Sequence, residues 1–341
     1  MKTDLYPPRK ITLGSPRYVS RLLGSSIIAA ALLAASPVLA QKVPIITGAS
    51  GWLFPGWESL KDFDQNGINS SADLISDASK ALAARDIRLI TIIAPLKARF
   101  HGDKLPENVQ MSEAVMKQYD FIIDALKSRG VATVDLRPAI SSVQQGKQTA
   151  FYRADYHWTA WSSEAAADAV AASIKDSGIK LAGAAGSGDK LGEWMTQRHY
   201  GDLAERFLSP DDKKKVGPEL FTVRAAAAGQ GNSLLGQEGP APVHVVGNSF
   251  VQPYLGFPQK LSNDLDRQVS LTWNPGNVGP WVSFLQYVES PAFQKNPPQF
   301  VVWFFNEGAF HSTPDNVEQW DSSSLMSPQQ WRSRLDAALR R

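Results

Sequence analysis

Two short segments carry the side chains that could do chemistry at neutral pH. Residues 153–158 read Arg-Ala-Asp-Tyr-His-Trp, which sets the carboxylate of Asp155 two positions from the imidazole of His157. Residues 244–250 read His-Val-Val-Gly-Asn-Ser-Phe and present Ser249 directly after a short β-branched run. A carboxylate, an imidazole and a hydroxyl are the groups that turn a serine into a nucleophile. We therefore predict a triad of these three residues, although its chain order, Asp before His before Ser, is uncommon.

In this hypothesis each member of the triad has one role. His157 takes the proton of Ser249 as a general base and later returns it, while Asp155 accepts the other ring N–H and stabilises the imidazolium. Because side chains two positions apart in an extended segment lie on one face, direct contact between Asp155 and His157 requires a turn. From the residues alone, Ser249 could also be a helix N-cap, and His157 a packed histidine. A metal site that adds His199 has no ligand spacing to support it, so we expect no metal and no cofactor.

Alternating strand and helix patterns predict the elements that position these groups. Apolar runs predict buried strands at four places: residues 86–94, 131–136, 243–246 and 298–305. Helical spacing of apolar or alanine residues predicts four helices: residues 71–85, 113–128, 161–174 and 327–341. This alternation is typical of an α/β fold in which helices cover a mostly parallel sheet.

Ser249 would then follow a strand and precede a helical segment, at the sheet edge where open α/β folds bind ligands. Gly247 permits a tight turn there, and free backbone N–H groups at the start of the next segment could hold an oxyanion. Asn248 is either an oxyanion donor or a residue that tolerates unusual backbone angles. The glycine- and amide-rich loop 273–279 is either a further oxyanion donor or a plain turn.

Aromatic and basic residues near these motifs are candidates for binding a substrate. The chain has 10 tryptophans, and the face of an indole ring suits the apolar face of a pyranose. We expect most of them to lie in the core and Trp158 to line the cleft. Arg153, Lys97 and Arg99 are candidates for binding a uronic acid carboxylate, with solvated surface charges as the alternative.

The N-terminal segment, residues 1–40, reads as a secretory signal peptide. Five basic residues precede the apolar stretch 22–35, and small residues between Ser36 and Ala40 suit a signal peptidase. We therefore expect cleavage after Ala40 and a periplasmic mature protein, with an uncleaved membrane anchor as the alternative.

Charge and cysteine content exclude several classes of function. The chain has a formal charge of +2, and residues 1–40 hold five Lys/Arg and one Asp, a net of +4, so residues 41–341 come to −2. This leaves no basic field for nucleic acid. The absence of cysteine excludes disulfides, thiol chemistry and Cys-based metal sites. The length supports a large core, so we predict one domain over 41–341, with an irregular insertion or lid at about 180–240.

Four segments, in this order along the chain, resemble the AlgJ/AlgX-like alginate and exopolysaccharide O-acetyltransferases of the SGNH-hydrolase-like superfamily. They are Gly51-Trp-Leu-Phe54, Thr91-Ile-Ile-Ala-Pro-Leu-Lys-Ala-Arg99, Asp155-Tyr-His-Trp-Thr159 and Gly247-Asn-Ser-Phe250. The resemblance implies a three-layer α/β/α fold with a mostly parallel sheet and a permuted order of catalytic motifs. It also implies a nucleophilic Ser249 and a tyrosine near the reaction centre, for which Tyr254 is the candidate.

The resemblance further implies a periplasmic enzyme that acetylates hydroxyl groups of an alginate-like or cellulose-like exopolysaccharide through an acetyl-enzyme on Ser249. The acetyl donor would be delivered by a membrane-bound O-acyltransferase (MBOAT), with peripheral contact to an inner-membrane synthesis or export complex. Two alternatives remain open. A carbohydrate acetylesterase would use the same triad with water as the acceptor, and a non-catalytic polysaccharide-binding or export protein would not need Ser249.

Overall fold

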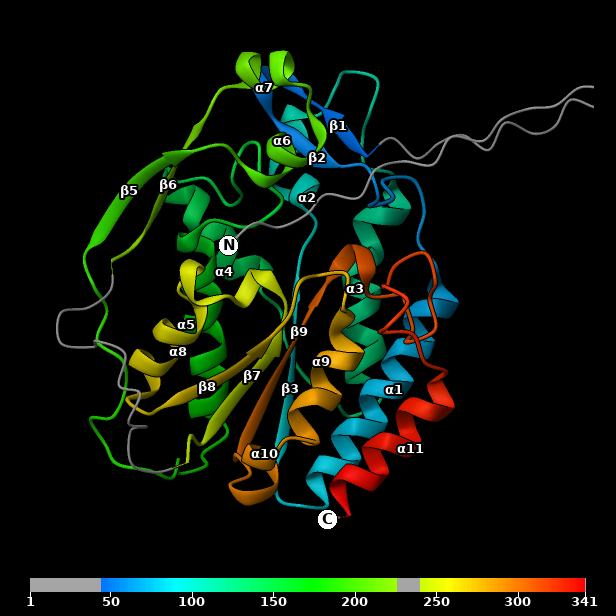
Figure 1. Cartoon of the computed structure of the whole chain (residues 1–341), viewed down its shortest axis with the longest axis vertical. Helices are drawn as coiled ribbons and strands as arrows, with labels where there is room; N and C mark the ends of the chain where they lie inside the picture. Colours follow the sequence, from blue (N-terminus) through cyan, green and yellow to red (C-terminus); the bar gives the residue numbers. More distant parts are fainter. Residues whose placement is uncertain (1–43, 226–239, 341) are drawn as a thin grey trace, which may run out of the picture. The chain divides into compact units, whose positions relative to one another are not determined.

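A computed structural model of the chain describes residues 44–225 and 240–340. The predicted signal peptide and its cleavage site lie outside these residues. Within them, no helix combines the length and the apolar character that crossing a membrane requires. The described residues are built around one five-stranded sheet, accompanied by two small antiparallel ribbons (Figure 1).

The central sheet has the strand order β4-β3-β9-β7-β8, and every neighbouring pair runs parallel. Its members are β3 (Arg88–Ala94), β4 (Ala132–Val134), β7 (Val243–Gly247), β8 (Val269–Trp273) and β9 (Phe300–Asn306). The four predicted strands correspond to β3, β4, β7 and β9. The last strand among the described residues, β9, therefore lies at the centre of the sheet.

Helices cover both faces of the sheet, which confirms the predicted three-layer α/β/α architecture (Figure 1). One layer consists of α1 (Gln65–Ala83), α3 (Glu113–Lys127), α9 (Gly279–Val288) and α11 (Pro328–Leu339). The other layer consists of α4 (Arg137–Gln145), α5 (Ala160–Asp176) and α8 (Phe257–Leu265). Two short helices adjoin strand ends in the sequence: α2 (Lys97–His101) and α10 (Pro291–Lys295).

The helix predicted at 71–85 begins six residues earlier, at Gln65. The side chain of Asp64 caps it by accepting a hydrogen bond from the backbone N–H of Gly67 at 3.0 Å. The first turn is polar, so its hydrophobic periodicity starts only at Ile68, the first buried residue of the helix. A capping interaction therefore extends this helix beyond its hydrophobic pattern.

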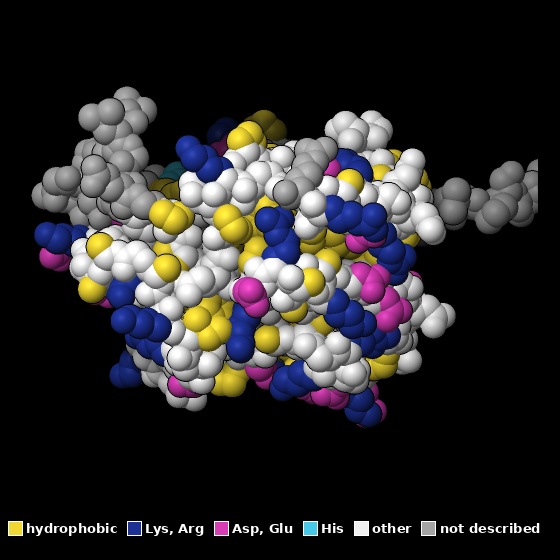
Figure 2. Space-filling view, turned by 90° about the horizontal axis from the view of Figure 1, so that it is seen from below, with side chains coloured by type: hydrophobic (Ala, Val, Ile, Leu, Met, Phe, Trp, Pro, Cys, Tyr) yellow, Lys and Arg dark blue, Asp and Glu magenta, His cyan; other side chains and the backbone are white. Residues whose placement is uncertain are grey.

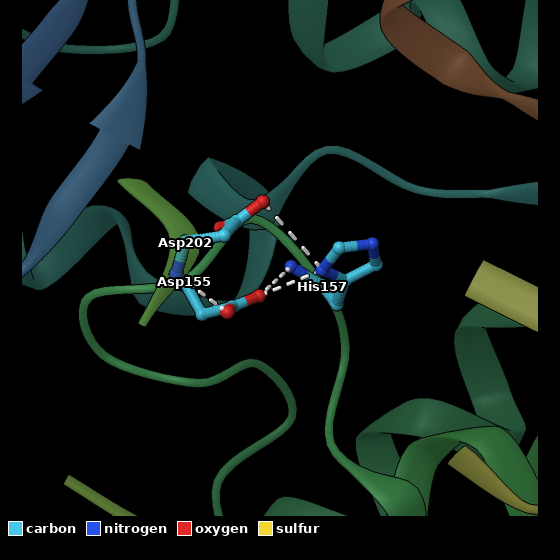
Figure 3. A group of neighbouring side chains, drawn as sticks. All are labelled: Asp155, His157 and Asp202. Carbon is cyan, nitrogen blue, oxygen red and sulfur yellow. Dashed lines mark hydrogen bonds and ion pairs between the residues drawn. The ribbon is translucent and has the colours of Figure 1, made fainter. Parts of the chain in front are cut away.

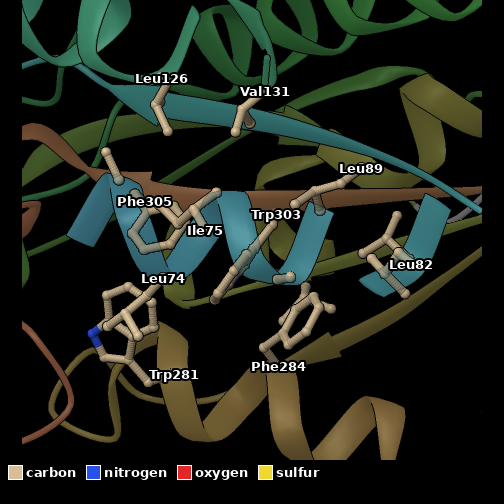
Figure 4. Close-up of a cluster of buried hydrophobic side chains, with 14 of the residues drawn as sticks. Leu74, Ile75, Leu82, Leu89, Leu126, Val131, Trp281, Phe284, Trp303 and Phe305 are labelled. Atoms are coloured by element: carbon tan, nitrogen blue, oxygen red, sulfur yellow. The ribbon is translucent and has the colours of Figure 1, made fainter. Parts of the chain in front are cut away.

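Strand β9 divides the core into two parts because its side chains alternate between the faces of the sheet. Trp303 and Phe305 pack into the core formed with α1, α3, α9 and α11, whereas Val302 and Phe304 pack into the core on the α5 side. Figure 4 shows the first of these cores, in which the ring of Phe284 stacks on Trp303 at 4.1 Å between centroids. Burial on both faces explains why this strand reads as a continuous apolar run.

The segment predicted as an irregular insertion at about 180–240 contains regular structure. Strands β5 (Trp194–His199) and β6 (Glu219–Arg224) pair antiparallel, and α6 (Asp202–Phe207) and α7 (Pro210–Val216) lie between them in the chain. All six residues of β5 are exposed, so no apolar alternation marks it in the sequence. Residues 226–239 of this segment lie outside the described part of the chain.

The second ribbon pairs β1 (Ile45–Thr47) with β2 (Leu53–Pro55) antiparallel. Both ribbons lie toward the end of the sheet at which its parallel strands finish, near α2, α6 and α7 (Figure 1). The opposite side, where these strands begin, carries Lys, Arg, Asp and Glu side chains interspersed with neutral and hydrophobic ones (Figure 2). The two ribbons therefore lie near the carboxyl ends of the parallel strands, which is the edge where a ligand site is expected.

Candidate active site

A cleft of about 780 Å³ lies at the carboxyl ends of β7, β8 and β9. The last residues of these strands, Gly247, Trp273 and Asn306, contribute to its wall. Helix α6 and the segment after β2 supply further lining residues. Its position agrees with the expectation that ligands bind where parallel strands end.

Ser249 lines this cleft two residues after the end of β7. It begins a single 3₁₀ turn, Ser249–Val251, rather than the helix expected from the sequence. Gly247 is required by close packing, because a Cβ there would lie 2.5 Å from Cγ2 of Val251 and 2.9 Å from Cβ of Phe304. The lack of a side chain at Gly247 therefore serves close packing at the end of β7, and Gly247 is not among the glycines with a positive φ.

Asp155 and His157 lie in a tight loop closed by an antiparallel bridge between Phe151 and Trp158. The backbone N–H of Tyr152 donates to the carbonyl of His157 at 3.2 Å. Oδ1 of Asp155 accepts the backbone N–H of His157 at 2.8 Å. The loop thus supplies the turn that direct contact between Asp155 and His157 requires.

Asp155, His157 and Ser249 form one hydrogen-bonded chain. Nδ1 of His157 lies 2.7 Å from Oδ1 of Asp155, and Nε2 lies 2.7 Å from Oγ of Ser249. A carboxylate accepts hydrogen bonds only, so the ring proton is assigned to Nδ1. Nε2 is then the acceptor for the hydroxyl proton of Ser249, which is the arrangement that proton abstraction by His157 needs.

Electrostatics favour an ionised Asp155 beside a readily protonated His157. Burial alone would raise the pKa of Asp155, but hydrogen bonds from His157 and from the backbone N–H of Asp202 hold it well below its usual value. Burial would likewise lower the pKa of His157, yet the hydrogen bond and charge of Asp155 outweigh it and leave that pKa above its usual value. The arrangement therefore stabilises the imidazolium that forms when His157 accepts a proton.

Asp202, the first residue of α6, is a member of the site that the sequence analysis missed. Its Oδ2 lies 3.9 Å from Nδ1 of His157, and its Oδ1 accepts the backbone N–H of Tyr156 at 2.7 Å (Figure 3). Burial and the charge of Asp155 raise the pKa of Asp202 to about 6. No sequence motif marks this residue, because the packing of Gly201 against the backbone of Ala154 brings α6 to the loop.

The ligand atoms of Asp155, His157 and Asp202 lie within 4.8 Å of one another, so these are the described residues that could hold a metal ion. Both carboxylate oxygens of Asp155 are already hydrogen-bonded, and Nδ1 of His157 donates to one of them. His199 is not part of the group, since its Nε2 lies 3.2 Å from the hydroxyl of Tyr254. The bonding within this group favours proton transfer over metal binding.

Asn248 has ordinary extended backbone angles, so the alternative of unusual angles is wrong. Its Oδ1 accepts the backbone N–H of Phe250 at 3.0 Å, and its Nδ2 donates to Oδ1 of Asn306 at 2.5 Å. The N–H groups of Phe250 and Val251 are both engaged, the latter with the carbonyl of Asn248. The backbone N–H groups of Phe250 and Val251, which were the expected oxyanion donors, are thus already hydrogen-bonded. Asn306 lines the cleft beside Asn248 and adds a second side-chain amide to it.

Three sequence candidates lie outside the cleft lining. Trp158 is fully buried and donates from Nε1 to the carbonyl of Phe250 at 2.9 Å, so the expectation that it lines the cleft is wrong. The guanidinium of Arg153 bonds the carbonyls of Gly51, Val216 and Gly217. Tyr254 is 39% exposed and contacts the ribbon strand β5 through His199 and Gln197. The loop 273–279, by contrast, does contribute to the cleft wall through Trp273, Pro275, Gly276 and Asn277.

The sequence left two alternatives for Lys97 and Arg99, binding a uronic acid carboxylate or lying solvated on the surface. Neither holds. Lys97 is 1% exposed, and its Nζ donates to the carbonyls of Leu53, Arg153 and Asp155 at 2.6–2.9 Å. Arg99 forms an ion pair with the buried Glu307. Both cations hold the framework behind the cleft, so neither is available to a ligand.

Comparisons with known proteins agree with this architecture. The profile of the family described as "SGNH hydrolase-like domain, acetyltransferase AlgX" matches residues 45–307. The "Probable alginate O-acetylase AlgJ" of Pseudomonas aeruginosa is 26% identical over 294 residues, which are 82% of this chain and 73% of that protein. The AlgJ of Pseudomonas fluorescens, named likewise, is 28% identical over 77% of this chain and 67% of its own length. The "Alginate biosynthesis protein AlgX" of Pseudomonas putida is 23% identical, and the match covers 56% of its length.

Solved structures show the same fold. The O-acetyltransferase domain of Pseudomonas putida AlgJ superposes with a TM-score of 0.67 and 24% identity, over 86% of this chain and 99% of that one. Pseudomonas aeruginosa AlgX gives a TM-score of 0.56 and 19% identity, over 80% of this chain and 68% of that one. The predicted SGNH-like fold is thus confirmed.

Proposed function

The chain belongs to the family of SGNH hydrolase-like acetyltransferase domains typified by AlgX, and we propose that it acetylates hydroxyl groups of an exopolysaccharide in the periplasm. The reaction proceeds through an acetyl-enzyme on Ser249. The observation that carries this proposal is the hydrogen-bonded chain from Asp155 through His157 to Ser249, which ends in an open cleft. The names of the AlgJ and AlgX relatives support a polysaccharide as the acceptor.

In the first half-reaction Oγ of Ser249 attacks the carbonyl carbon of the acetyl donor. Nε2 of His157 takes the hydroxyl proton, and Asp155 stabilises the resulting imidazolium through Nδ1. When the tetrahedral intermediate collapses, the bond to the donor's leaving group breaks and His157 returns the proton to that group. The product is an acetyl ester on Ser249 and a neutral imidazole.

Asn306 is our candidate for stabilising the negative oxygen of the tetrahedral intermediate. Since Oδ1 of Asn248 accepts the N–H of Phe250, Nδ2 of Asn248 must be the group that bonds Asn306. Asn306 then presents its carbonyl oxygen to Asn248, which leaves its NH₂ group for the cleft that it lines. A fixed amide donor of this kind is suited to a developing oxyanion.

In the second half-reaction a sugar hydroxyl gives its proton to His157 and attacks the acetyl ester, which restores Ser249. An oriented hydroxyl has an effective concentration of up to roughly 10⁵ M or more, enough to compete with water. The acetyl donor in this proposal reaches the site through a membrane-bound O-acyltransferase partner of a synthesis or export complex. A carbohydrate acetylesterase would use the same residues with water as the acceptor.

Labelling of Ser249 tests the acetyl-enzyme. Purified protein given nitrophenyl acetate should gain one acetyl group on the peptide that contains Ser249, and Ser249→Ala should gain none. His157→Ala should lower kcat by about 10⁴-fold or more. Asn306→Ala should still be labelled, with kcat lower by about 10²- to 10³-fold. His199→Ala is the matched control, because this exposed histidine lies outside the cleft lining and its loss should leave the rate unchanged.

Mass spectrometry of glycan products separates transfer from hydrolysis. Wild-type protein given the donor and an unacetylated oligosaccharide should yield oligosaccharide that carries an added acetyl group. Wild-type turnover by Ser249→Ala would refute the covalent mechanism. Donor hydrolysis without any oligosaccharide product, across neutral and acidic glycans, would assign the site to an acetylesterase.

A further inference from the structure

Side-chain amides are the largest group among the polar side chains of the cleft wall. Five of its lining residues are asparagine or glutamine: Asn248, Gln252, Asn277, Asn306 and Gln319. An amide both donates and accepts, so it matches a sugar hydroxyl, which does the same. The amides come from the ends of β7 and β9, the loop after β8 and the segment before α11. A hydroxyl-rich ligand would therefore find partners on several sides of the cleft.

The charged residues of the wall are mostly acidic. Glu58, Asp202 and Glu318 line the cleft, and Arg206 is the only lysine or arginine among the described residues that do so. The guanidinium of Arg206 lies 5.3 Å from the ring centroid of Phe207. A polymer of uronic acids carries one carboxylate on each sugar, and each carboxylate taken out of water needs a cationic or hydrogen-bonding partner. One arginine beside three carboxyl groups does not supply such a series.

Burial at the cleft already acts on two of its own carboxyl groups. Burial raises the pKa of Glu58 to about 8, even though its Oε1 accepts a hydrogen bond from the hydroxyl of Tyr156 at 2.9 Å. Burial and the charge of Asp155 raise the pKa of Asp202 to about 6. A cleft that favours the protonated form of its own carboxyl groups would also disfavour a ligand carboxylate.

Two partly exposed indole rings offer the apolar contact that pyranose faces need. Trp57 is 38% exposed and Trp273 is 40% exposed, and both line the cleft. Trp57 packs against Tyr156 and Phe207, with ring centroids 5.4 and 5.8 Å away, which restricts its ring. Rings held in this way can stack on the C–H face of a sugar at little cost in side-chain entropy.

We propose that the cleft takes a neutral, hydroxyl-rich glycan as its acceptor and discriminates against polyuronates. The side-chain amides of the wall other than that of Asn248 bind its hydroxyl groups, and Trp57 and Trp273 stack on its sugar rings. The carboxylates of Asp202 and Glu318 repel a ligand carboxylate, and the neutral, buried Glu58 offers it no positive partner. The role of this glycan as acceptor rests on the acetyl transfer proposed above. A neutral glycan carries no carboxylate, whereas a polyuronate carries one on each sugar, so probes matched in configuration and length separate the two.

Binding to Ser249→Ala, which cannot turn over, tests the proposal by calorimetry. The two probes are a neutral β-1,4-linked mannose oligosaccharide and a β-1,4-linked mannuronate oligosaccharide of the same length, which differ in the oxidation of C6. The neutral glycan should bind about tenfold more tightly or better, with no dependence on salt. Binding of the uronate should strengthen as salt screens the repulsion. Tighter binding of the uronate that weakens with salt would overturn the proposal.

Three tryptophan variants locate the binding site. Trp57→Ala and Trp273→Ala should each weaken binding of the neutral glycan by roughly three- to tenfold. Trp194→Ala is the matched control, because Trp194 is 37% exposed but lies on β5, outside the cleft lining, against Arg224. Equal loss in all three variants would contradict a glycan site in the cleft.

The two proposals fail in different ways. If nitrophenyl acetate acetylates Ser249 but neither glycan binds at millimolar concentrations, the acceptor proposal is wrong and the acetyl-enzyme stands. If the neutral glycan binds but Ser249 is never acetylated, the enzymatic function is wrong, and the cleft is a glycan-binding site without acetyl transfer.

Discussion

At the scale of single residues, Asp155 joins more of the site than its two-residue spacing from His157 implies. Its carboxylate accepts the backbone and ring N–H groups of His157 and the backbone N–H of Asp202. Its carbonyl accepts Nζ of Lys97. One residue therefore fixes the imidazole, the start of α6 and the buried lysine behind the loop, so its replacement is expected to disturb geometry as well as charge.

The pH dependence of the reaction should reveal the charge of Asp202. His157 acts as a base only when neutral, so kcat/KM should rise with pH through the pKa of His157, which lies above its usual value. Asp202→Asn removes a negative charge that raises this pKa, while the amide oxygen can still accept the N–H of Tyr156. The acid limb of the kcat/KM profile should therefore move to lower pH. Initial rates with nitrophenyl acetate measure it.

Asp211→Asn provides the matched control for that experiment. Asp211 lies on α7, where it pairs with Lys214 on the surface, and it does not line the cleft. Its profile should coincide with that of the wild type. A shift of equal size in both variants, or a shift to higher pH in Asp202→Asn, would show that the charge of Asp202 does not act on His157.

At the scale of elements, Lys97 links three parts of the chain. It is the first residue of α2, and its Nζ bonds carbonyls of β2 and of the loop that carries Asp155 and His157. Burial lowers the pKa of Lys97 to about 7, and nearby carboxylates, Glu219 first among them, counteract this effect. The side chain thus replaces water as the partner of three buried carbonyls.

Lys97→Met should therefore destabilise the protein by about 2–4 kcal/mol, because three carbonyls lose their donor while the apolar stem is kept. It should also lower kcat, since the loop that carries Asp155 loses an anchor. Urea unfolding and nitrophenyl acetate hydrolysis measure the two effects. Lys104→Met, at a lysine whose side chain is 39% exposed, should change stability by less than about 0.5 kcal/mol. Equal stability of Lys97→Met and the wild type would show that the three bonds contribute nothing.

The sequence was sufficient for four of the five strands of the sheet, but not for the half-buried β8 or for every contact in the site. Continuous apolar runs identified β3, β7 and β9, and type and order identified Asp155, His157 and Ser249, which the structure brings together. The place of Trp158 next to His157 in the sequence suggests that it lines the cleft, but adjacency does not show toward which side a loop residue points, and Trp158 is buried. Asn306 was missed because only the sheet order, with β9 beside β7, brings it next to Asn248. Helix α6 is only six residues long, which is too short for the repeated apolar spacing that identifies longer helices in a sequence.

At the scale of the whole molecule, buried carboxyl groups at the cleft should shape the stability curve. Glu58 is 7% exposed, and burial raises its pKa from 4.5 to about 8. A pKa raised by folding means that the folded state binds more protons than the unfolded state between these values. The stability from protonated Glu58 is therefore complete below pH 4.5 and is lost as pH rises through about 8.

Glu58→Gln should flatten this part of the pH dependence. In the wild type, ionisation of Glu58 lowers the free energy of unfolding by up to about 1.4 kcal/mol per pH unit as the pH rises. The amide cannot ionise, so this decline should be absent from the variant, which should be more stable than the wild type in alkali. Denaturant unfolding at a series of pH values measures the slope. Glu107→Gln, at an exposed glutamate, should leave the curve unchanged. A wild-type slope in Glu58→Gln would assign the decline to other groups.

The central position of β9 has a consequence for how the polypeptide is made. Its partners β3 and β7 leave the ribosome long before it, and the hydrogen bond from Leu96 to Glu307 joins residues 211 positions apart. Until Phe300–Asn306 has been synthesised, both neighbouring strands present unpaired edges, which are prone to non-native association. The nascent chain therefore cannot complete the sheet by adding strands in the order in which they are synthesised. The sheet can be completed only after β9 has left the ribosome, so its earlier strands stay unpaired for longer than they would in a sheet built from neighbouring segments.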